Sequence, residues 1–463
     1  MPAHLETPRV HRAIESPAGA LLTTRPYEWL KRRSLPREFR TARLRAVADR
    51  TASAGVDAYL DELGIDRAAG RKRVRDALER HRGRKRARDA LEVRWETVFW
   101  DGGDATLDGR VALETDRRTV SGRWARAGDL LEATPDAERV AAVDFDVPDP
   151  DDALAAWESR LDDPASAYAA PDRVPAVETS ATVPGPDTSE YWVRFPSVSE
   201  HVAEPASAKV FEPRQEHGLP TLVFGSGLGM MYDLLSYWPE EEYVGRELAA
   251  RGYRVVLPES PWHGRRERPG RYSGEPYLAE PPVSLVRLYA AQLREWAVLT
   301  AWAREEGAPV VGVGGISLGG IATLLLAGFC GPWPDEMTPD LAFPAAPSAR
   351  LDRVLAGSEL TGLLGVREAL RDAGWTDDRL AEFAPLLTPP DDAGVPPERV
   401  FPFAGRRDRM APYGDARDVL SRWGVPPQNR TEWDVGHFGV LVTLLRQSTY
   451  QDAVAAQLDW HAR

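Results

Sequence analysis

Three residues in the carboxyl-terminal half of the chain have the types and the order that nucleophilic catalysis requires, and the first of them is Ser317. Residues 315–319 read Gly-Ile-Ser-Leu-Gly, the only match in the chain to the pattern Gly-x-Ser-x-Gly. In this pattern a strand turns sharply into a helix and leaves the serine hydroxyl exposed, and a Cβ at either glycine would collide with neighbouring backbone. Because an apolar run precedes Ser317 and an apolar helical run follows it, we predict a nucleophile rather than an ordinary serine in a glycine-rich turn.

A serine hydroxyl attacks effectively only when a base removes its proton and a carboxylate orients that base. Asp408 follows the apolar segment 399–404, and His437 follows the segment 430–433. The order serine, aspartate, histidine is the one expected where a mostly parallel sheet carries the three residues at the ends of its strands. We therefore predict His437 as the base and Asp408 as its carboxylate. The competing residues are Asp415, Asp418 and Asp434 for the carboxylate and His263 for the base.

The negative charge that develops on an attacked carbonyl oxygen needs two N–H donors. One is expected to be the amide of Leu318, and the other an amide in the Ser-Gly-Leu-Gly segment 226–229, for which we choose Leu228. Met230, Trp262 and His263 are predicted to contact the substrate near an apolar acyl pocket, although each is as readily explained as a core residue.

The elements that must position these residues begin at about residue 190, where strand-like and helix-like segments start to alternate. This alternation predicts a mostly parallel sheet with helices on both faces, over residues 190–463. Residues 331–398 interrupt it with helices that we expect to form a lid. Residues 1–92 are predicted to be a helical extension, and residues 93–189 a region of short strands, at 93–100 and 110–114, followed by a linker rich in Pro and Asp.

Two motifs carry a resemblance to a known group of proteins. Residues 258–266 read Pro-Glu-Ser-Pro-Trp-His-Gly-Arg-Arg, and residues 315–320 read Gly-Ile-Ser-Leu-Gly-Gly. On these motifs residues 190–463 resemble the α/β-hydrolase superfamily, and within it the family called abhydrolase domain-containing eighteen. That family has a similar Glu-Ser-Pro-x-x-Gly-x-Arg turn and a Ser-Met-Gly-Gly elbow, where this chain has Leu318 in place of methionine. The Trp-Glu-Thr at residues 95–97 extends the match upstream. The resemblance implies a serine-hydrolase scaffold acting on ester-type substrates.

Composition limits the classes of protein to which the chain can belong. It has 463 residues, of which 43% are hydrophobic and 28% charged, as expected of a globular chain with a large core and an accessory region. The sequence shows no apolar run of membrane-spanning length and no signal-peptide pattern, and its single cysteine suits a reducing cytoplasm. No cysteine or histidine cluster predicts a metal site, and no cofactor is expected.

The charge distribution bears on partners. A net charge of -13 disfavours nucleic acid. Basic residues concentrate at 71–73 and 82–86, where they are explained by contact with an anionic partner, a membrane surface or RNA, or, more simply, by a solvated helix face. The sequence thus predicts a cytoplasmic carboxylic-ester hydrolase acting on a small acyl ester. The alternatives are thioester cleavage or acyl transfer on the same fold, and a non-catalytic scaffold that works through its basic N-terminal helices.

Overall fold

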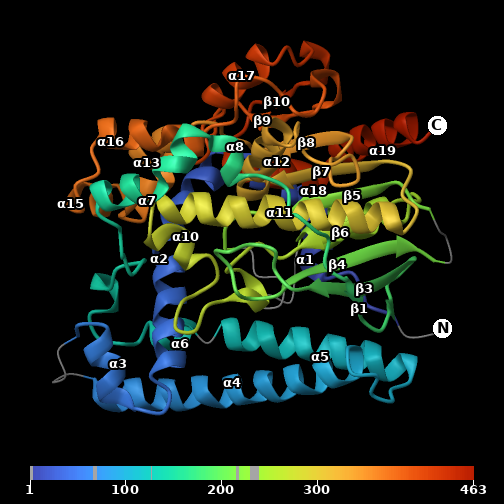
Figure 1. The fold of residues 1–463 in the computed structure, drawn as a ribbon. Helices are drawn as coiled ribbons and strands as arrows, with labels where there is room; N and C mark the ends of the chain where they lie inside the picture. Colours follow the sequence, from blue (N-terminus) through green and yellow to red (C-terminus); the bar gives the residue numbers. More distant parts are fainter. Residues whose placement is uncertain (1–3, 66–69, 127, 215–217, 230–238) are drawn as a thin grey trace.

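One large sheet forms the centre of the computed structural model (Figure 1), which describes residues 4–65, 70–126, 128–214, 218–229 and 239–463. The strands are β1 (Glu178–Thr179), β2 (Val183–Pro184), β3 (Thr188–Phe195), β4 (Ala206–Pro213), β5 (Thr221–Gly225), β6 (Arg254–Pro258), β7 (Val311–Ile316), β8 (Leu341–Ala345), β9 (Phe403–Gly405) and β10 (Thr431–Trp433). Their order is β1-β3-β4-β6-β5-β7-β8-β9-β10, with β2 paired to β3. The adjacent strands β6, β5, β7, β8, β9 and β10 run parallel to one another, whereas β4 runs antiparallel to both β3 and β6. The predicted mostly parallel sheet is confirmed.

Helices cover both faces of this sheet, because successive strand residues point in opposite directions. In the described residues the helices are α1 (Arg9–Glu15), α2 (Arg25–Arg50), α3 (Val56–Glu62), α4 (Arg71–Phe99), α5 (Leu107–Ala125), α6 (Gly128–Leu131), α7 (Pro150–Asp162), α8 (Pro164–Ala167), α9 (Glu247–Ala249), α10 (Glu275–Ala279), α11 (Val283–Glu305), α12 (Leu318–Phe329), α13 (Leu351–Gly357), α14 (Glu359–Leu363), α15 (Val366–Asp372), α16 (Asp377–Phe383), α17 (Tyr413–Arg422), α18 (His437–Arg446) and α19 (Thr449–His461). Val223 and Val256 share a core with α11 and α12, whereas Leu222 and Val255 share another with α9, α18 and α19. Among the described helices, none combines the length and the apolar character needed to span a membrane.

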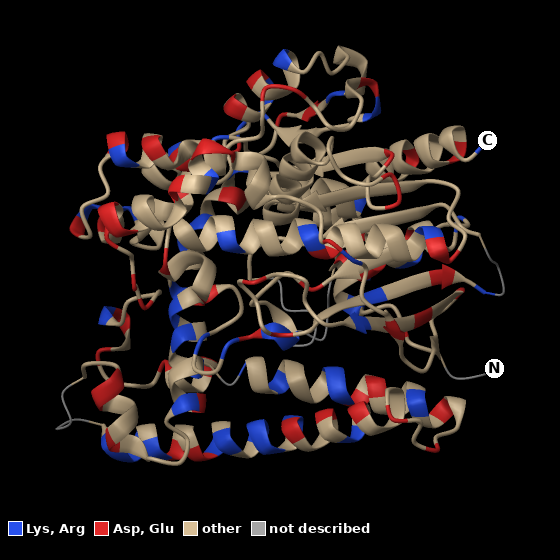
Figure 2. Ribbon diagram, viewed as in Figure 1, with Lys and Arg blue, Asp and Glu red and all other residues tan. Residues whose placement is uncertain are grey.

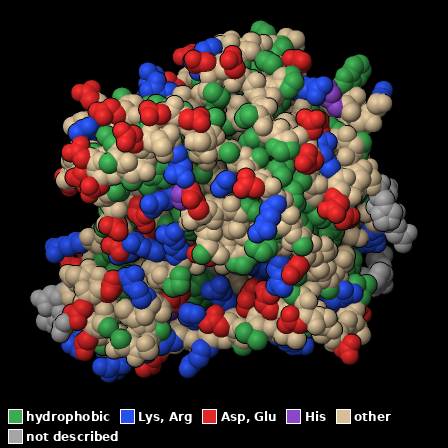
Figure 3. Space-filling view, in the orientation of Figure 1, with side chains coloured by type: hydrophobic (Ala, Val, Ile, Leu, Met, Phe, Trp, Pro, Cys, Tyr) green, Lys and Arg blue, Asp and Glu red, His purple; other side chains and the backbone are tan. Residues whose placement is uncertain are grey.

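The N-terminal helices lie against one edge and one end of the sheet. In Figure 1, α4 and α5 run side by side below the sheet, and α2 rises from them. Basic residues predominate along α4, with acidic residues between them (Figure 2), and Lys85 there pairs with Asp89 at 2.7 Å. In the space-filling view, acidic side chains are frequent over α7, α15 and α16 (Figure 3). The helix α2 contacts α4 and α6, and it also contacts α18.

Two predicted strands are wrong: residues 93–100 fall in α4 and its C-cap, and residues 110–114 fall in α5. The aromatic and β-branched residues there suggested strands, but their burial follows the helical period. Trp95 and Phe99, four residues apart, are buried and stack at 4.7 Å between ring centroids, whereas Val93 is 68% exposed. Side chains at i and i+4 meet on one face of a helix. Packing against α5 and the sheet edge therefore overrode the β-propensity of these residues.

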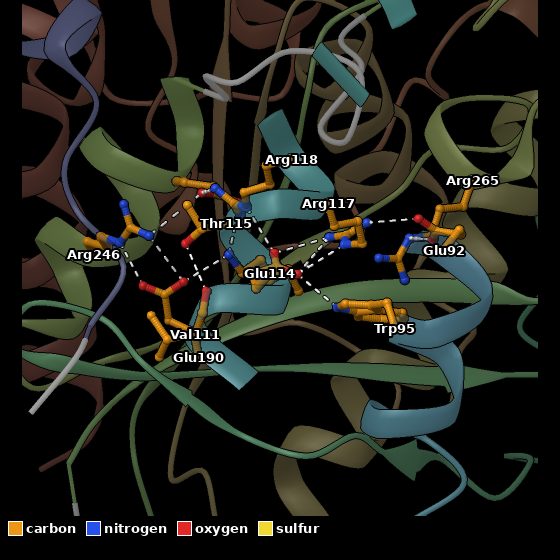
Figure 4. Close-up of polar contacts among 12 residues, drawn as sticks. Glu92, Trp95, Val111, Glu114, Thr115, Arg117, Arg118, Glu190, Arg246 and Arg265 are labelled. Atoms are coloured by element: carbon orange, nitrogen blue, oxygen red, sulfur yellow. Dashed lines mark hydrogen bonds and ion pairs between the residues drawn. The ribbon is translucent and has the colours of Figure 1, made fainter. Parts of the chain in front are cut away.

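A buried network of charged side chains joins α5 to the sheet (Figure 4). Glu114 on α5 accepts hydrogen bonds from Trp95 Nε1 at 2.8 Å and from Arg118 Nε at 2.9 Å. Arg118 also donates to Glu241, and that carboxylate accepts a 2.9 Å bond from Lys209 on β4. Buried charges of this kind are tolerated only where opposite charges surround them. The network therefore fastens the pair α4 and α5 to the sheet.

The helices α13 to α16 lie between β8 and β9 in the chain, and residues before β3 pack against this region. Residues 331–398 contain β8, which is a strand of the sheet, followed by α13 to α16. Part of the Pro- and Asp-rich linker expected within residues 93–189 is firmly packed. Tyr168 is fully buried, stacks on Phe329 and donates its hydroxyl to Leu386 O at 2.6 Å. This region therefore supports the helices between β8 and β9.

Candidate active site

Ser317 lies at the predicted strand-to-helix turn, between the end of β7 and the start of α12. Its φ of 56° and ψ of -112° place a non-glycine residue in a strained conformation. The surrounding glycines permit the close approach of backbones that this turn requires. A Cβ on Gly319 would lie 2.2 Å from Gly225 O, and a Cβ on Gly320 would lie 2.1 Å from Ala345 O. The expected steric need for glycine at this elbow is confirmed.

The structure brings the three predicted residues into one hydrogen-bonded chain. His437 Nε2 lies 3.0 Å from Ser317 Oγ, and His437 Nδ1 lies 2.6 Å from Asp408 Oδ2. The other carboxylate oxygen of Asp408 accepts bonds from the amides of Met410 and Ala411, both at 2.9 Å. Asp408 is therefore fixed by its own loop, and its remaining oxygen holds the imidazole with Nε2 toward the serine. This is the arrangement in which an imidazole can take a proton from a hydroxyl.

The electrostatic environment of His437 favours its protonated form. Burial lowers the pKa of an imidazole, but the charge of Asp408 and its hydrogen bond outweigh burial, so that the pKa of His437 is raised above its ordinary value. A smaller contribution in the same direction comes from Glu28, on α2. A base that gains a proton during attack is stabilised by this arrangement.

The rival residues are engaged elsewhere. Asp415 on α17 pairs with Arg353 at 2.6 Å, and Asp434 pairs with Arg407 at 3.2 Å. Asp418 is an exposed residue of α17. His263 places Nδ1 2.8 Å from Pro261 O, and burial lowers its pKa to about 4. Of the candidates, Asp408 and His437 are the ones that the structure places beside Ser317.

The predicted oxyanion donors lie beside the nucleophile. Leu318 is the first residue of α12, so its N–H has no acceptor within that helix. Leu228 lies in the loop after β5 and lines the cavity at Ser317. The bond from Gly319 N to Ser226 O, at 3.0 Å, ties this loop to the elbow. Two N–H groups near the serine are what an oxyanion requires.

Of the residues predicted to contact substrate, the structure places none of the described ones at the cavity beside Ser317. Met230 lies outside the described residues. Trp262 is buried with a φ of 65°, and Arg268 lies over its ring at 4.7 Å. Neither Trp262 nor His263 is among the described residues that line the cavity at Ser317. Both belong instead to the turn after β6, where Arg266 forms a buried ion pair with Glu295 at 2.6 Å.

A cavity of about 110 Å³ opens beside Ser317. Its described lining is Leu35, Phe39, Gly227, Leu228, Glu240, Ile316, Ser317, Leu360, Met410, His437, Phe438 and Leu441. Most of these side chains are apolar, which suits an acyl chain. Leu35 and Phe39 come from α2, and sequence analysis did not place them at the site. The sequence feature that could have indicated them is an apolar pair at a spacing of four in a highly charged part of the helix.

The chain resembles several solved structures in fold, although no family model matches its sequence. No protein-family model matches the sequence, and no curated protein matches it. Among solved structures, an acetyl xylan esterase from Paenibacillus sp. R4 matches 68% of this chain and 96% of its own, with 15% identity and a TM-score of 0.45. The esterase Est22 matches 69% and 93%, with 17% identity and a TM-score of 0.40. An acylaminoacyl peptidase from Pyrococcus horikoshii matches 58% and 41%, with 14% identity and a TM-score of 0.40. These TM-scores lie below 0.5, so the chemistry of the site rests on the geometry of this chain.

Proposed function

We propose that this protein is a serine hydrolase of the α/β-hydrolase type that cleaves carboxylic esters. The observation that carries the proposal is the hydrogen-bonded chain from Ser317 Oγ through His437 to Asp408. The sheet supports it, because β6 and β7 lie on opposite sides of β5. Ligands of open parallel sheets bind outside the carboxyl ends of strands at such a switch point. Ser317, after β7, and Leu228, after β5, lie at that place.

The proposed reaction has two halves. Ser317 Oγ attacks the ester carbonyl carbon while His437 Nε2 takes the hydroxyl proton, and the carbonyl oxygen gains negative charge. The amides of Leu228 and Leu318 bind this oxyanion. The carbon–oxygen bond to the alcohol then breaks, and His437 returns its proton to the departing oxygen. Water, deprotonated by His437, attacks the acyl-enzyme in the same way and releases the acid and the free serine.

Covalent labelling tests the proposal directly. A fluorophosphonate probe is expected to modify the wild-type protein on Ser317, as located by mass spectrometry of the labelled peptide. His437→Ala removes the base and is expected to abolish labelling while the melting temperature stays near that of the wild type. A folded wild-type protein that takes up no label, or takes it up on another residue, would remove the basis of the proposal.

The cavity predicts which esters are preferred. Phe39→Ala removes most of an aromatic side chain from its wall, and longer acyl chains should then fit. Because each buried methylene contributes about 0.8 kcal/mol, we expect kcat/KM for p-nitrophenyl octanoate relative to butyrate to rise about tenfold or more. Trp29→Ala is the matched control, since Trp29 is an exposed aromatic residue of the same helix. An unchanged chain-length profile in Phe39→Ala would show that α2 does not bound the acyl site.

The finer assignments stay predictions. These are the narrower resemblance to abhydrolase domain-containing eighteen, the cytoplasmic location, the use of residues 331–398 as a lid, and membrane contact through basic N-terminal helices. Leu360, on α14, supports the lid proposal because it lies in the wall of the cavity.

A further inference from the structure

The helix that carries the catalytic histidine is capped at its N-terminus by a side chain from a distant helix. His437 is the first residue of α18, and the N-cap residue is Gly436, which has no side chain to cap the first-turn amides. The carboxylate of Glu28, on α2, takes this role, because its Oε2 accepts a hydrogen bond from Gly439 N at 3.2 Å. A Cβ on Gly436 would lie 2.5 Å from Glu28 Cδ. The glycine therefore leaves the space that the distant carboxylate occupies.

The position of His437 creates an electrostatic need for such a carboxylate. The N-terminus of a helix carries partial positive charge, which disfavours an imidazolium formed there. The carboxylates that raise the pKa of His437 are Asp408, from the loop after β9, and Glu28, from α2. Glu240 lines the same cavity as His437, and Lys31 Nζ lies 5.9 Å from the centroid of the Phe438 ring. Arg32 also faces Glu28, but it donates to Glu359 on α14. The charges of both carboxylates, Asp408 and Glu28, thus favour the imidazolium against the helix dipole.

The state of Glu28 agrees with this geometry. Burial raises the pKa of Glu28, and the charge of His437 and the hydrogen bond from Gly439 oppose that rise. A carboxylate that the protein desolvates and then supports with an amide and an imidazole acts on those two groups in return. No such pairing exists for Glu132, whose bonds to Arg37 and Thr41 hold another part of α2.

We propose that Glu28 is a positioning residue for His437. From α2, the Glu28 carboxylate caps the N-terminus of α18 and stabilises the imidazolium that forms on His437 during acyl transfer. This inference rests on the proposed role of His437 as the base. It makes α2 part of the catalytic centre through two sets of contacts. Glu28 holds the base, and Leu35 and Phe39 line the cavity.

Two substitutions separate the charge of Glu28 from its contact. Glu28→Gln keeps an oxygen acceptor for Gly439 and removes the negative charge, so the pKa of His437 should fall by about half a unit to one unit. Because the neutral imidazole then persists to lower pH, the acid limb of kcat/KM should move to lower pH by the same amount. Glu28→Asp keeps the charge but shortens the reach, so the melting temperature should fall while the pKa of His437 stays near its wild-type value.

The measurement is an NMR titration of the full-length protein with labelled histidine, with the His437 signal assigned from its loss in His437→Gln. It is accompanied by pH–rate profiles with p-nitrophenyl butyrate. Glu132→Gln, which removes another carboxylate bonded to α2, is expected to leave both the His437 titration and the rate profile unchanged. A wild-type His437 titration in Glu28→Gln, or equal shifts in the glutamine and aspartate variants, would overturn the inference.

The titration and the rates also separate this inference from the proposed function. A lowered pKa in Glu28→Gln together with an inactive wild-type enzyme would uphold the electrostatic link and reject ester hydrolysis. An active wild-type enzyme with an unshifted His437 would do the reverse.

Discussion

Ser317→Ala is expected to lower kcat/KM for p-nitrophenyl esters by about 10⁴-fold to 10⁶-fold. The substitution removes the atom that forms the acyl-enzyme, while the base, its carboxylate and the oxyanion amides stay in place. The small rate that remains should come from water attacking a bound ester beside the oxyanion amides. Alanine has the same steric preferences as serine, so the strained backbone at the elbow persists and the fold is retained. Steady-state rates with matched melting curves provide the measurement.

A second serine provides the control for this loss. Ser421 is an exposed residue of α17, and its hydroxyl donates to Arg417 O at 2.7 Å and accepts a bond from Arg430 Nη1 at 2.8 Å, both at the protein surface. Ser421→Ala should therefore leave the rate and the melting temperature within experimental error of the wild type. If Ser317→Ala kept more than about a tenth of the wild-type activity, far above the residual rate of a disabled triad, another group would have to be the nucleophile.

The elbow, and the meeting of Ser317, Asp408 and His437, were predictable because each depends on local sequence with a steric or chemical requirement. The glycines at 319 and 320 meet backbone oxygens that exclude a Cβ, and such exclusions leave a readable pattern. Strands β7, β9 and β10 also lie, within a few residues, where the sequence shows the apolar run before Ser317 and the segments 399–404 and 430–433. The histidine and aspartate then followed from strand ends and chain order.

The contribution of the N-terminal region could not be predicted in the same way. Glu28, Leu35 and Phe39 act on groups more than 180 residues away in the sequence, and nothing local shows which partner a helix face will meet. For the first 92 residues the sequence therefore predicts a helical extension, but no role for it at the site of Ser317. The misassigned strand at 93–100 has a related cause: β-branched and aromatic residues suit both a strand and a buried helix face, and the distant partner decides.

The contacts of α2 were unpredictable for the same reason: each depends on two segments that are far apart in the sequence. The helix α2 has one face that meets α18, α14 and the cavity, and the sequence shows this face only as scattered apolar and acidic residues. The contact made by Glu28 depends on a glycine at 436, which by itself resembles any glycine before a helix. Complementary features on two distant segments become informative only when the fold brings them together.

Asp408→Asn is expected to have the second large effect: kcat should fall by about 10³-fold to 10⁴-fold while the fold is retained. The amide oxygen of asparagine can still accept the bonds from Met410 N and Ala411 N, so the loop should stay in place. Its NH₂ group then faces His437 Nδ1 and favours the tautomer with the proton on Nε2. That nitrogen can no longer take the proton of Ser317. Rates in single-turnover and steady-state experiments measure the loss.

The pH dependence distinguishes this role from a structural one. Since the Asp408 carboxylate is the main group that raises the pKa of His437, removing its charge should lower that pKa and move the acid limb of the rate profile to lower pH. Asp434→Asn is the matched control, because Asp434 pairs with Arg407 at the surface. Equal losses in Asp434→Asn and Asp408→Asn, or an unmoved acid limb, would mean that Asp408 does not orient the base, and the geometry at 2.6 Å would need another explanation.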